Sequence, residues 1–343
     1  MDFMNNFFKN INTPSIISII GLAKNVSKTT TLNYLISNLV EKYKLGLTSI
    51  GRDGEKYDVI TQLPKPRIFI KKGTYIATAK QCFEASQINF EIIKNTKCNT
   101  PLGEIYILKA LNEGYIELAG PSINKYLYQI CLELKDLGCD LILIDGAFDR
   151  RSYATPLISD ATILSTGASV SENMKEVIDV TTHIIELLSV VNEKNQEITD
   201  LANNVLKKSK ISIIDTENSV KLLEVLTSLD SAKDIADNLE NNSKYVVIEG
   251  AITDKLLNDL MQLTEKYKGV TFLVEDATKL FLSKKTMNKF QKKGGILKVL
   301  NPINIIAITI NPTSPEGYKF NKDKFLKQLK ENLTIPVYNL LEE

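Results

Sequence analysis

The chain has 343 residues, 43% of them hydrophobic, and its 42 Lys and Arg nearly balance its 41 Asp and Glu, which leaves a formal net charge of +1. This length predicts two domains, or one large α/β domain with an extension. The balanced charge argues against a general nucleic-acid binder, because binding through many phosphate contacts needs a basic field.

No apolar run reaches the roughly 18 residues that span a bilayer, and residues 1–10 are too polar for a secretory signal. We therefore expect a cytoplasmic protein that does not associate with membranes. His183 is the single histidine, so zinc or acid–base chemistry built on histidine is nearly excluded. The cysteines lack a C-x-x-C pair and are expected to be reduced thiols: Cys82, Cys98, Cys131 and Cys139. Cys131 and Cys139 are expected to be buried like small hydrophobic residues.

The first predicted elements are a strand and a helix joined by a loop. The run Ile-Ile-Ser-Ile-Ile at 16–20 predicts a buried strand, and apolar residues in 32–40 predict an amphipathic helix. The loop between them therefore lies at a helix N-terminus, where unpaired backbone N–H groups and the helix dipole attract an anion. In such a loop Lys28 can reach the β- and γ-phosphates of a nucleotide, and the hydroxyl of Thr29 can hold Mg²⁺.

This loop, Gly-Leu-Ala-Lys-Asn-Val-Ser-Lys-Thr-Thr-Thr at 21–31, departs from the usual phosphate-binding pattern. The usual pattern has four residues between two glycines before Lys-Ser/Thr. Here five residues separate Gly21 from Ser27, and Ser27 stands where the second glycine belongs. A glycine, five residues and Gly-Lys-Thr resembles the loop of the dethiobiotin synthetase and cobyrinate diamide synthase group of P-loop proteins. Because the Cβ of Ser27 can crowd a phosphate, a plain strand, turn and helix with a chance Lys-Thr-Thr stays open as the alternative.

The next predicted strand covers 45–50 and runs into Gly-Arg-Asp-Gly-Glu at 51–55. This places Asp53 at the carboxyl edge of a parallel sheet, where ligands bind in open α/β folds. Residues 103–110 and 115–119, joined at 111–114, predict an inserted β-hairpin beside the main sheet. A helix follows over 123–137 and ends at Gly138.

Four apolar residues at 141–144 then predict a buried strand that ends in Asp145. Its carboxylate is expected to emerge beside the loop, where it can bind Mg²⁺ directly or through water. Arg150 and Arg151 follow, and either a structural ion pair or one arginine on a transferring phosphate is compatible with their position. A strand over 160–166 and a helix over 171–190 continue the alternation, which predicts right-handed parallel crossovers.

Beyond a polar stretch at 192–200, a second set of β/α units is expected. Strands are predicted at 211–215, 245–249, 270–274, 303–310 and 335–337, with helices at 254–267 and 322–333. We therefore predict a P-loop nucleotide-binding domain over 1–191, with the inserted hairpin, and a second, smaller α/β unit over 205–343. The turn at 311–318 is expected to be rigid, either as a structural loop or as a wall of a ligand or partner site.

The fold class predicted as a whole is α/β and P-loop NTPase-like, with a mainly parallel sheet flanked by helices. Six segments then carry a resemblance to one family: 21–31, 51–55, Gly-Thr-Tyr-Ile-Ala-Thr-Ala at 73–79, Glu-Leu-Ala-Gly-Pro-Ser at 117–122, Ile-Asp-Gly-Ala-Phe-Asp-Arg-Arg-Ser at 144–152 and Ser-Thr-Gly-Ala-Ser at 165–169. Together they resemble the P-loop subunit of the lysine 5,6-aminomutase reactivase, over residues 15–170.

That resemblance implies an ATP-dependent factor of lysine fermentation. Such a factor works with a second reactivase subunit to restore an adenosylcobalamin-dependent aminomutase whose cofactor is damaged, and it couples Mg-ATP binding and hydrolysis to cofactor exchange. Ser27 is the departure, since glycine is expected there. The sequence leaves homo-oligomerisation open.

The candidate site residues follow from the loop and the strand ends. The catalytic candidates are Lys28, Asp53 and Asp145. The candidates for contact with ATP are Gly21, Lys24, Asn25, Val26, Ser27, Lys28, Thr29 and Thr30. The candidate Mg²⁺ ligands are Thr29, Asp53 and Asp145.

Two other functions compete with an ATPase that reactivates an enzyme. One is an ATP-dependent ligase of the dethiobiotin or cobyrinate type, in which phosphate activates a small carboxylate. The other is a P-loop-like binding module whose nucleotide site is impaired by Ser27.

Overall fold

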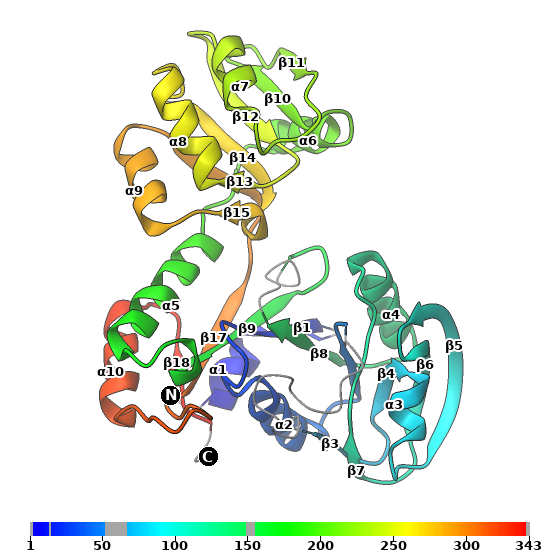
Figure 1. Ribbon diagram of the computed structural model, residues 1–343. Helices are drawn as coiled ribbons and strands as arrows, with labels where there is room; N and C mark the ends of the chain where they lie inside the picture. The colour runs from blue at the N-terminus through cyan, green and yellow to red at the C-terminus, as the bar shows by residue number, and fades with distance from the viewer. Residues whose placement is uncertain (1–2, 14, 52–66, 149–154, 341–343) are drawn as a thin grey trace. The chain divides into compact units, whose positions relative to one another are not determined.

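The computed structural model describes residues 3–13, 15–51, 67–148 and 155–340. The chain forms two units, Met1–Thr182 with Asn304–Glu343, and His183–Ile303. The second unit is therefore an insertion between two parts of the first. This division corrects the predicted boundaries, because the end of the chain, coloured orange to red in Figure 1, joins the sheet of the first unit and not the second unit.

The first unit is built on a mixed sheet with the strand order β18-β17-β9-β1-β8-β2-β4-β6-β5. All pairings from β18 to β4 are parallel, whereas β4–β6 and β6–β5 are antiparallel. The strands are β1 (Ser15–Gly21), β2 (Leu45–Ser49), β4 (Tyr75–Ala79), β5 (Phe90–Thr100), β6 (Gly103–Ala110), β8 (Leu141–Phe148), β9 (Ala161–Gly167), β17 (Ile305–Asn311) and β18 (Val337–Tyr338).

Helices cover both faces of this sheet. Along β1, Ile17 and Ile19 pack in one core cluster with α2, while Ile16 packs in another cluster with α4. The alternation follows from the two-residue period of a strand, and it explains why the central strands are apolar on both faces. The helices of the unit are α1 (Phe3–Asn10), α2 (Lys28–Leu39), α3 (Lys80–Glu84), α4 (Asn124–Asp136), η2 (Ala168–Val170) and α10 (Lys322–Asn332), and α5 (Met174–Leu188) leads into the second unit. The predicted α/β class, with a mostly parallel sheet between helices, is confirmed.

The inserted hairpin is present, but its strands differ from the prediction. β6 pairs with β5, from Phe90↔Ala110 to Thr100↔Gly103, instead of with residues 115–119. The short β7 (Gly114–Ile116) pairs instead with β3 (Ile68–Ile70). β5 was not predicted because it is an edge strand with a single buried residue and two register shifts, so it lacks a clean two-residue alternation.

The second unit holds a smaller sheet in the order β11-β10-β12-β14-β16. β12, β14 and β16 are parallel, and β10 runs antiparallel to β12 and β11. This confirms a second α/β arrangement around the strands predicted at 211–215, 245–249 and 270–274. Its elements are α6 (Gln196–Leu206), β10 (Ile211–Asp215), β11 (Val220–Leu223), α7 (Ala232–Asn238), β12 (Ser243–Ile248), β13 (Ile252–Thr253), α8 (Asp254–Leu263), β14 (Thr271–Asp276), η3 (Ala277–Lys279), β15 (Leu280–Phe281), α9 (Lys284–Lys292) and β16 (Ile296–Asn301).

The strands predicted at 303–310 and 335–337 exist, but they lie in the first unit. β17 pairs with β9 in parallel, with Ile308 opposite Leu164, and β18 pairs with β17. Consecutive strands usually pair with each other, and this preference led the prediction to assign both to the second unit. β17 is nevertheless buried along most of its length, as expected for a strand inside a parallel sheet.

Candidate functional site

The loop at residues 22–27 lies at the carboxyl edge of the first unit's sheet. It follows β1, which is flanked on either side by β8 and β9. In register, Gly21 at the end of β1 lies opposite Ser165 of β9, and the backbone N–H of Leu22 donates to the carbonyl of Ser165 at 3.0 Å. The loop therefore begins at the centre of the sheet, at the edge where open α/β folds bind ligands.

Two loop residues have left-handed backbone conformations. Asn25 has φ 60° and Ser27 has φ 68°. Ser27 is the N-cap of α2, but its side chain makes no capping hydrogen bond, while its carbonyl accepts from the N–H and the hydroxyl of Thr31 at 3.0 and 3.1 Å. Asn tolerates this conformation better than most residues, whereas Ser does not share that tolerance. Position 27 thus has the backbone of a glycine, which gives a conformational reason for the glycine expected there.

Lys28 folds back over the loop that precedes it. Its Nζ donates to the carbonyl of Ala23 at 3.1 Å. A Cβ placed on Gly21 would lie 2.9 Å from this Nζ and 2.7 Å from a methyl group of Val26, so a larger residue at 21 would displace the lysine. Burial lowers the pKa of Lys28, and the charge of Asp145 opposes that shift.

Asp145 lies between β1 and β2, opposite Ile19 on one side and Ser49 on the other. Burial raises its pKa to about 6, although the positive charge of Lys28 works in the opposite direction. The neighbouring Gly146 allows β8 to lie close to β1 at this point, because a Cβ on Gly146 would lie 2.4 Å from the carbonyl oxygen of Ile19. Lys28 and Asp145 therefore lie on neighbouring elements at the carboxyl edge of the sheet, and the charge of each shifts the pKa of the other.

The remaining candidates are distributed around the loop. Thr29 and Thr30 are half-buried in the first turn of α2, Val26 is buried, and Lys24 and Asn25 are exposed. Asp53, predicted as a catalytic residue and Mg²⁺ ligand, lies outside the described residues, as do Arg150 and Arg151.

Several contacts to the loop come from residues that sequence reasoning did not select. The carbonyl of Asn25 accepts from the side-chain amide of Asn311 at 2.9 Å and from the hydroxyl of Ser169 at 3.4 Å. Beneath the start of α2, the buried hydroxyls of Thr31 and Thr309 lie 3.0 Å apart, and Ser165 lies 2.8 Å from Thr309. In the sequence these residues stand at the polar ends of two apolar strands, at 165–169 and at 311, but no local sequence pattern indicates which residues they contact.

Within the part of the chain that the structure describes, no three His, Cys, Asp or Glu side chains gather in a group that could hold a metal. A site of one carboxylate and one hydroxyl suits Mg²⁺ only when waters or phosphate oxygens complete the shell. Among the described residues, Asp145 and Thr29 are the predicted ligands of these two types. The four cysteines are free thiols, as predicted, and all four are buried, including Cys131 and Cys139, for which burial was expected. His183 lies in the second unit, where its Nε2 is 2.7 Å from the carbonyl of Leu282.

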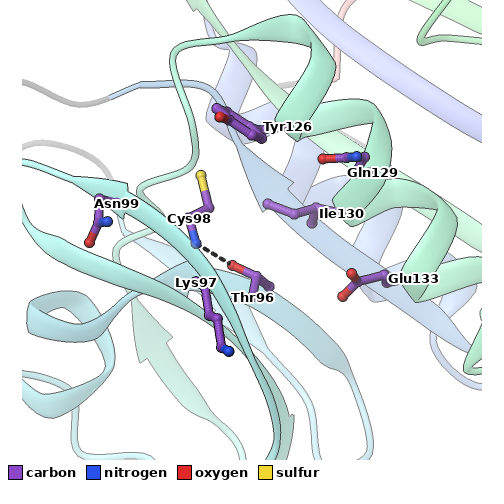
Figure 2. A pocket seen from close by; sticks show the side chains of 8 residues that line it. All are labelled: Thr96, Lys97, Cys98, Asn99, Tyr126, Gln129, Ile130 and Glu133. Carbon is purple, nitrogen blue, oxygen red and sulfur yellow. Dashed lines mark hydrogen bonds between the residues drawn. The ribbon is translucent and has the colours of Figure 1, made fainter.

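A separate hollow of about 260 Å³ lies between β5 and α4 (Figure 2). It contains no residue of the loop. Glu133 on its wall pairs through one carboxylate oxygen with Lys94 at 2.8 Å, which leaves a locally neutral pair. Its lining is Thr96, Lys97, Cys98, Asn99, Tyr126, Gln129, Ile130 and Glu133.

No protein-family model, curated protein or solved structure matches the chain. Among the described helices, none is both long and apolar enough to cross a membrane. The geometry of the loop is therefore what bears on the function of the chain. Its strand-to-helix junction, with Lys28 in α2 and Asp145 in an adjacent strand, is an arrangement that suits a polyanion accompanied by a divalent cation.

Proposed function

We propose that this chain is a P-loop NTPase-like protein that binds Mg-ATP at the loop between β1 and α2 and hydrolyses it. The observation that carries the proposal is the position of Lys28 at the N-terminus of α2, where its Nζ donates to the Ala23 carbonyl of the loop at 3.1 Å, with Asp145 in the strand adjacent to β1. A helix of 12 residues starts at this lysine and offers unpaired N–H groups and the positive end of its dipole. An ATP phosphate chain with Mg²⁺ matches both the positive and the negative groups.

Each residue has a distinct part in this proposal. Lys28 exchanges its bond to the Ala23 carbonyl for a phosphate oxygen and neutralises developing charge. Thr29 and Asp145 hold the cation, directly or through water. Bound Mg²⁺ would supply charge neutralisation on the phosphates. Because Lys28 and Asp145 are already oriented at the loop, little rearrangement is needed on binding.

We further propose that ATP turnover serves reactivation of an adenosylcobalamin-dependent aminomutase, together with a second reactivase subunit. The resemblance over residues 15–170 carries the identity of the client. The insertion of the second unit between β9 and β17 supports a factor that does mechanical work. Both of these strands end in residues that contact the loop, Ser169 just beyond β9 and Asn311 at the end of β17.

An impaired binding module is the second candidate, and one observation favours it. Ser27 has a left-handed backbone and carries a Cβ where glycine would carry none. In a loop whose N–H groups must converge on phosphate, that Cβ crowds the ligand. A ligase of the dethiobiotin or cobyrinate type is the third candidate.

Purified protein separates these candidates. We expect calorimetry at millimolar ATP with Mg²⁺ to detect binding, and hydrolysis to rise when an adenosylcobalamin-dependent aminomutase is added. Hydrolysis that depends on a small carboxylate instead would favour the ligase. The absence of ATP binding would leave the binding module and overturn both other functions.

Mg-ATP affinity is also expected to fall as the solution becomes acidic. A carboxylate must be ionised to hold Mg²⁺. With its pKa raised to about 6, Asp145 is almost fully ionised at pH 7.5. At pH 5.5 only about a quarter is ionised, which corresponds to about fourfold weaker binding. Calorimetry at both pH values measures the drop, and Asp145→Asn reports the titration of ATP itself. An equal drop in that variant would contradict a role for Asp145.

A further inference from the structure

The carbonyl of Asn25 is held by two side chains from distant parts of the chain. Asn311 donates to it through Nδ2 at 2.9 Å, and Ser169 donates through its hydroxyl at 3.4 Å. Asn25 is one of the two left-handed residues of the loop, two positions before Ser27. These contacts therefore act on a segment that holds two non-glycine residues in the left-handed conformation.

The side chain of Asn311 is oriented from its other end. Its Oδ1 accepts from the backbone N–H of Thr313 at 3.0 Å, so that Nδ2 faces the loop. The strands that carry the two donors are packed tightly against each other. Asn311 lies opposite Gly167 in register, and a Cβ on Gly167 would lie 2.2 Å from the Asn311 carbonyl oxygen. Asn311 is thus held at the end of β17 and Ser169 in η2 directly after β9, and the loop is the element that they restrain.

A loop with two non-glycine residues at positive φ persists only where surrounding contacts maintain it. Without the bonds to its carbonyl, Asn25 is free to return to a more common backbone conformation, and the N–H groups that follow it would turn away from a common centre. The hydrogen bonds from Asn311 and Ser169 oppose this change of backbone conformation in the ligand-free protein. Ordering the loop therefore costs less free energy when a ligand binds.

We propose that Asn311 and Ser169 form a clamp that holds the nucleotide loop in its binding conformation, with both acting as positioning residues that do not touch the ligand. The inference rests on the proposed function, since it assigns the loop to ATP. Asn311 is the stronger member because its hydrogen bond is shorter.

Asn311→Asp, assayed at high ionic strength so that its added negative charge is screened, tests the clamp. The aspartate keeps an acceptor for the N–H of Thr313 but has no donor for the Asn25 carbonyl. Mg-ATP affinity should fall about fivefold, the equivalent of about 1 kcal/mol for one hydrogen bond. The melting temperature should stay close to that of the wild type. Ser169→Ala should weaken binding about twofold.

Asn304→Asp is the matched control. Asn304 precedes the same strand at its other end and also donates its amide to a backbone carbonyl, that of Asp160 at 3.2 Å. It should leave ATP affinity unchanged. A merely structural role for Asn311 predicts a lower melting temperature with unaltered affinity, and that result would overturn the clamp.

Hydrogen exchange in the nucleotide-free protein separates the clamp from the proposed function. Amides of residues 25–29 should exchange faster in Asn311→Asp than in the wild type or Asn304→Asp. If the wild type fails to bind ATP, the proposed function is wrong, and faster exchange would still support the restraint on the loop. Unchanged exchange together with unchanged affinity would overturn the clamp while ATP binding stands.

Discussion

Lys28→Ala should lower ATP hydrolysis by about 10²–10³-fold, the usual effect of removing one electrostatic donor from a site where charge develops. Lys28 is the half-buried ammonium of the loop, folded across it to the Ala23 carbonyl. The substitution removes the positive charge that would balance the negative charges of the phosphates and of Asp145. Nucleotide binding should become undetectable by calorimetry, while circular dichroism should report an unchanged fold.

Lys24→Ala is the matched control for charge. Lys24 lies in the same loop but is exposed, so its removal should weaken binding only slightly and in a salt-dependent way. Lys28→Arg tests shape at constant charge, because a guanidinium is larger and forked where the lysine is a compact point charge. Equal hydrolysis by Lys28→Ala and the wild type would mean that this loop is not the site of turnover.

The elements nearest the loop were predictable from the sequence. β1 and residues 141–144 of β8 are apolar runs buried on both faces, and α2 buries Leu32, Leu35 and Leu39 along one side. Such patterns specify a strand or a helix locally. Their polar ends also predicted which side chains meet, because the carboxyl ends of parallel strands share one edge of the sheet. Lys28, at the start of α2, and Asp145, in the strand next to β1, both lie at that edge, as expected.

The order of the strands in the sheet was harder to predict from the sequence than the strands themselves. β17 joins β9 only after the whole second unit has intervened, and no local pattern marks that return. The predicted domain boundaries erred for this reason. The contact between Asn25 and Asn311 could not be predicted for the same reason, because the two residues are 286 positions apart and each alone is an ordinary polar turn residue. The left-handed backbone of Ser27, in contrast, agrees with a local rule, the expectation of glycine at that position.

Ser27→Gly is expected to tighten Mg-ATP binding about tenfold, the equivalent of about 1.4 kcal/mol. The left-handed conformation of Ser27 costs about 1–2 kcal/mol in a residue with a Cβ, and glycine avoids that cost. Glycine also gives the unfolded chain more conformational freedom, which destabilises the folded protein by roughly 0.5–1 kcal/mol. The free energy of unfolding, measured with urea, should therefore rise by roughly 0–1.5 kcal/mol. The larger part of the gain should appear in affinity, where removal of the Cβ opens the loop to phosphate.

Ser27→Ala distinguishes the backbone from the hydroxyl. Alanine keeps the Cβ and the left-handed strain but lacks the hydroxyl, which forms no capping bond in the structure. Alanine should therefore bind ATP as the wild type does, and only glycine should improve on it. If glycine and alanine tighten binding equally, the hydroxyl is the obstacle and not the Cβ. If glycine changes nothing while Lys28→Ala abolishes binding, the loop already accommodates serine, and the impaired binding module loses the one observation that favours it.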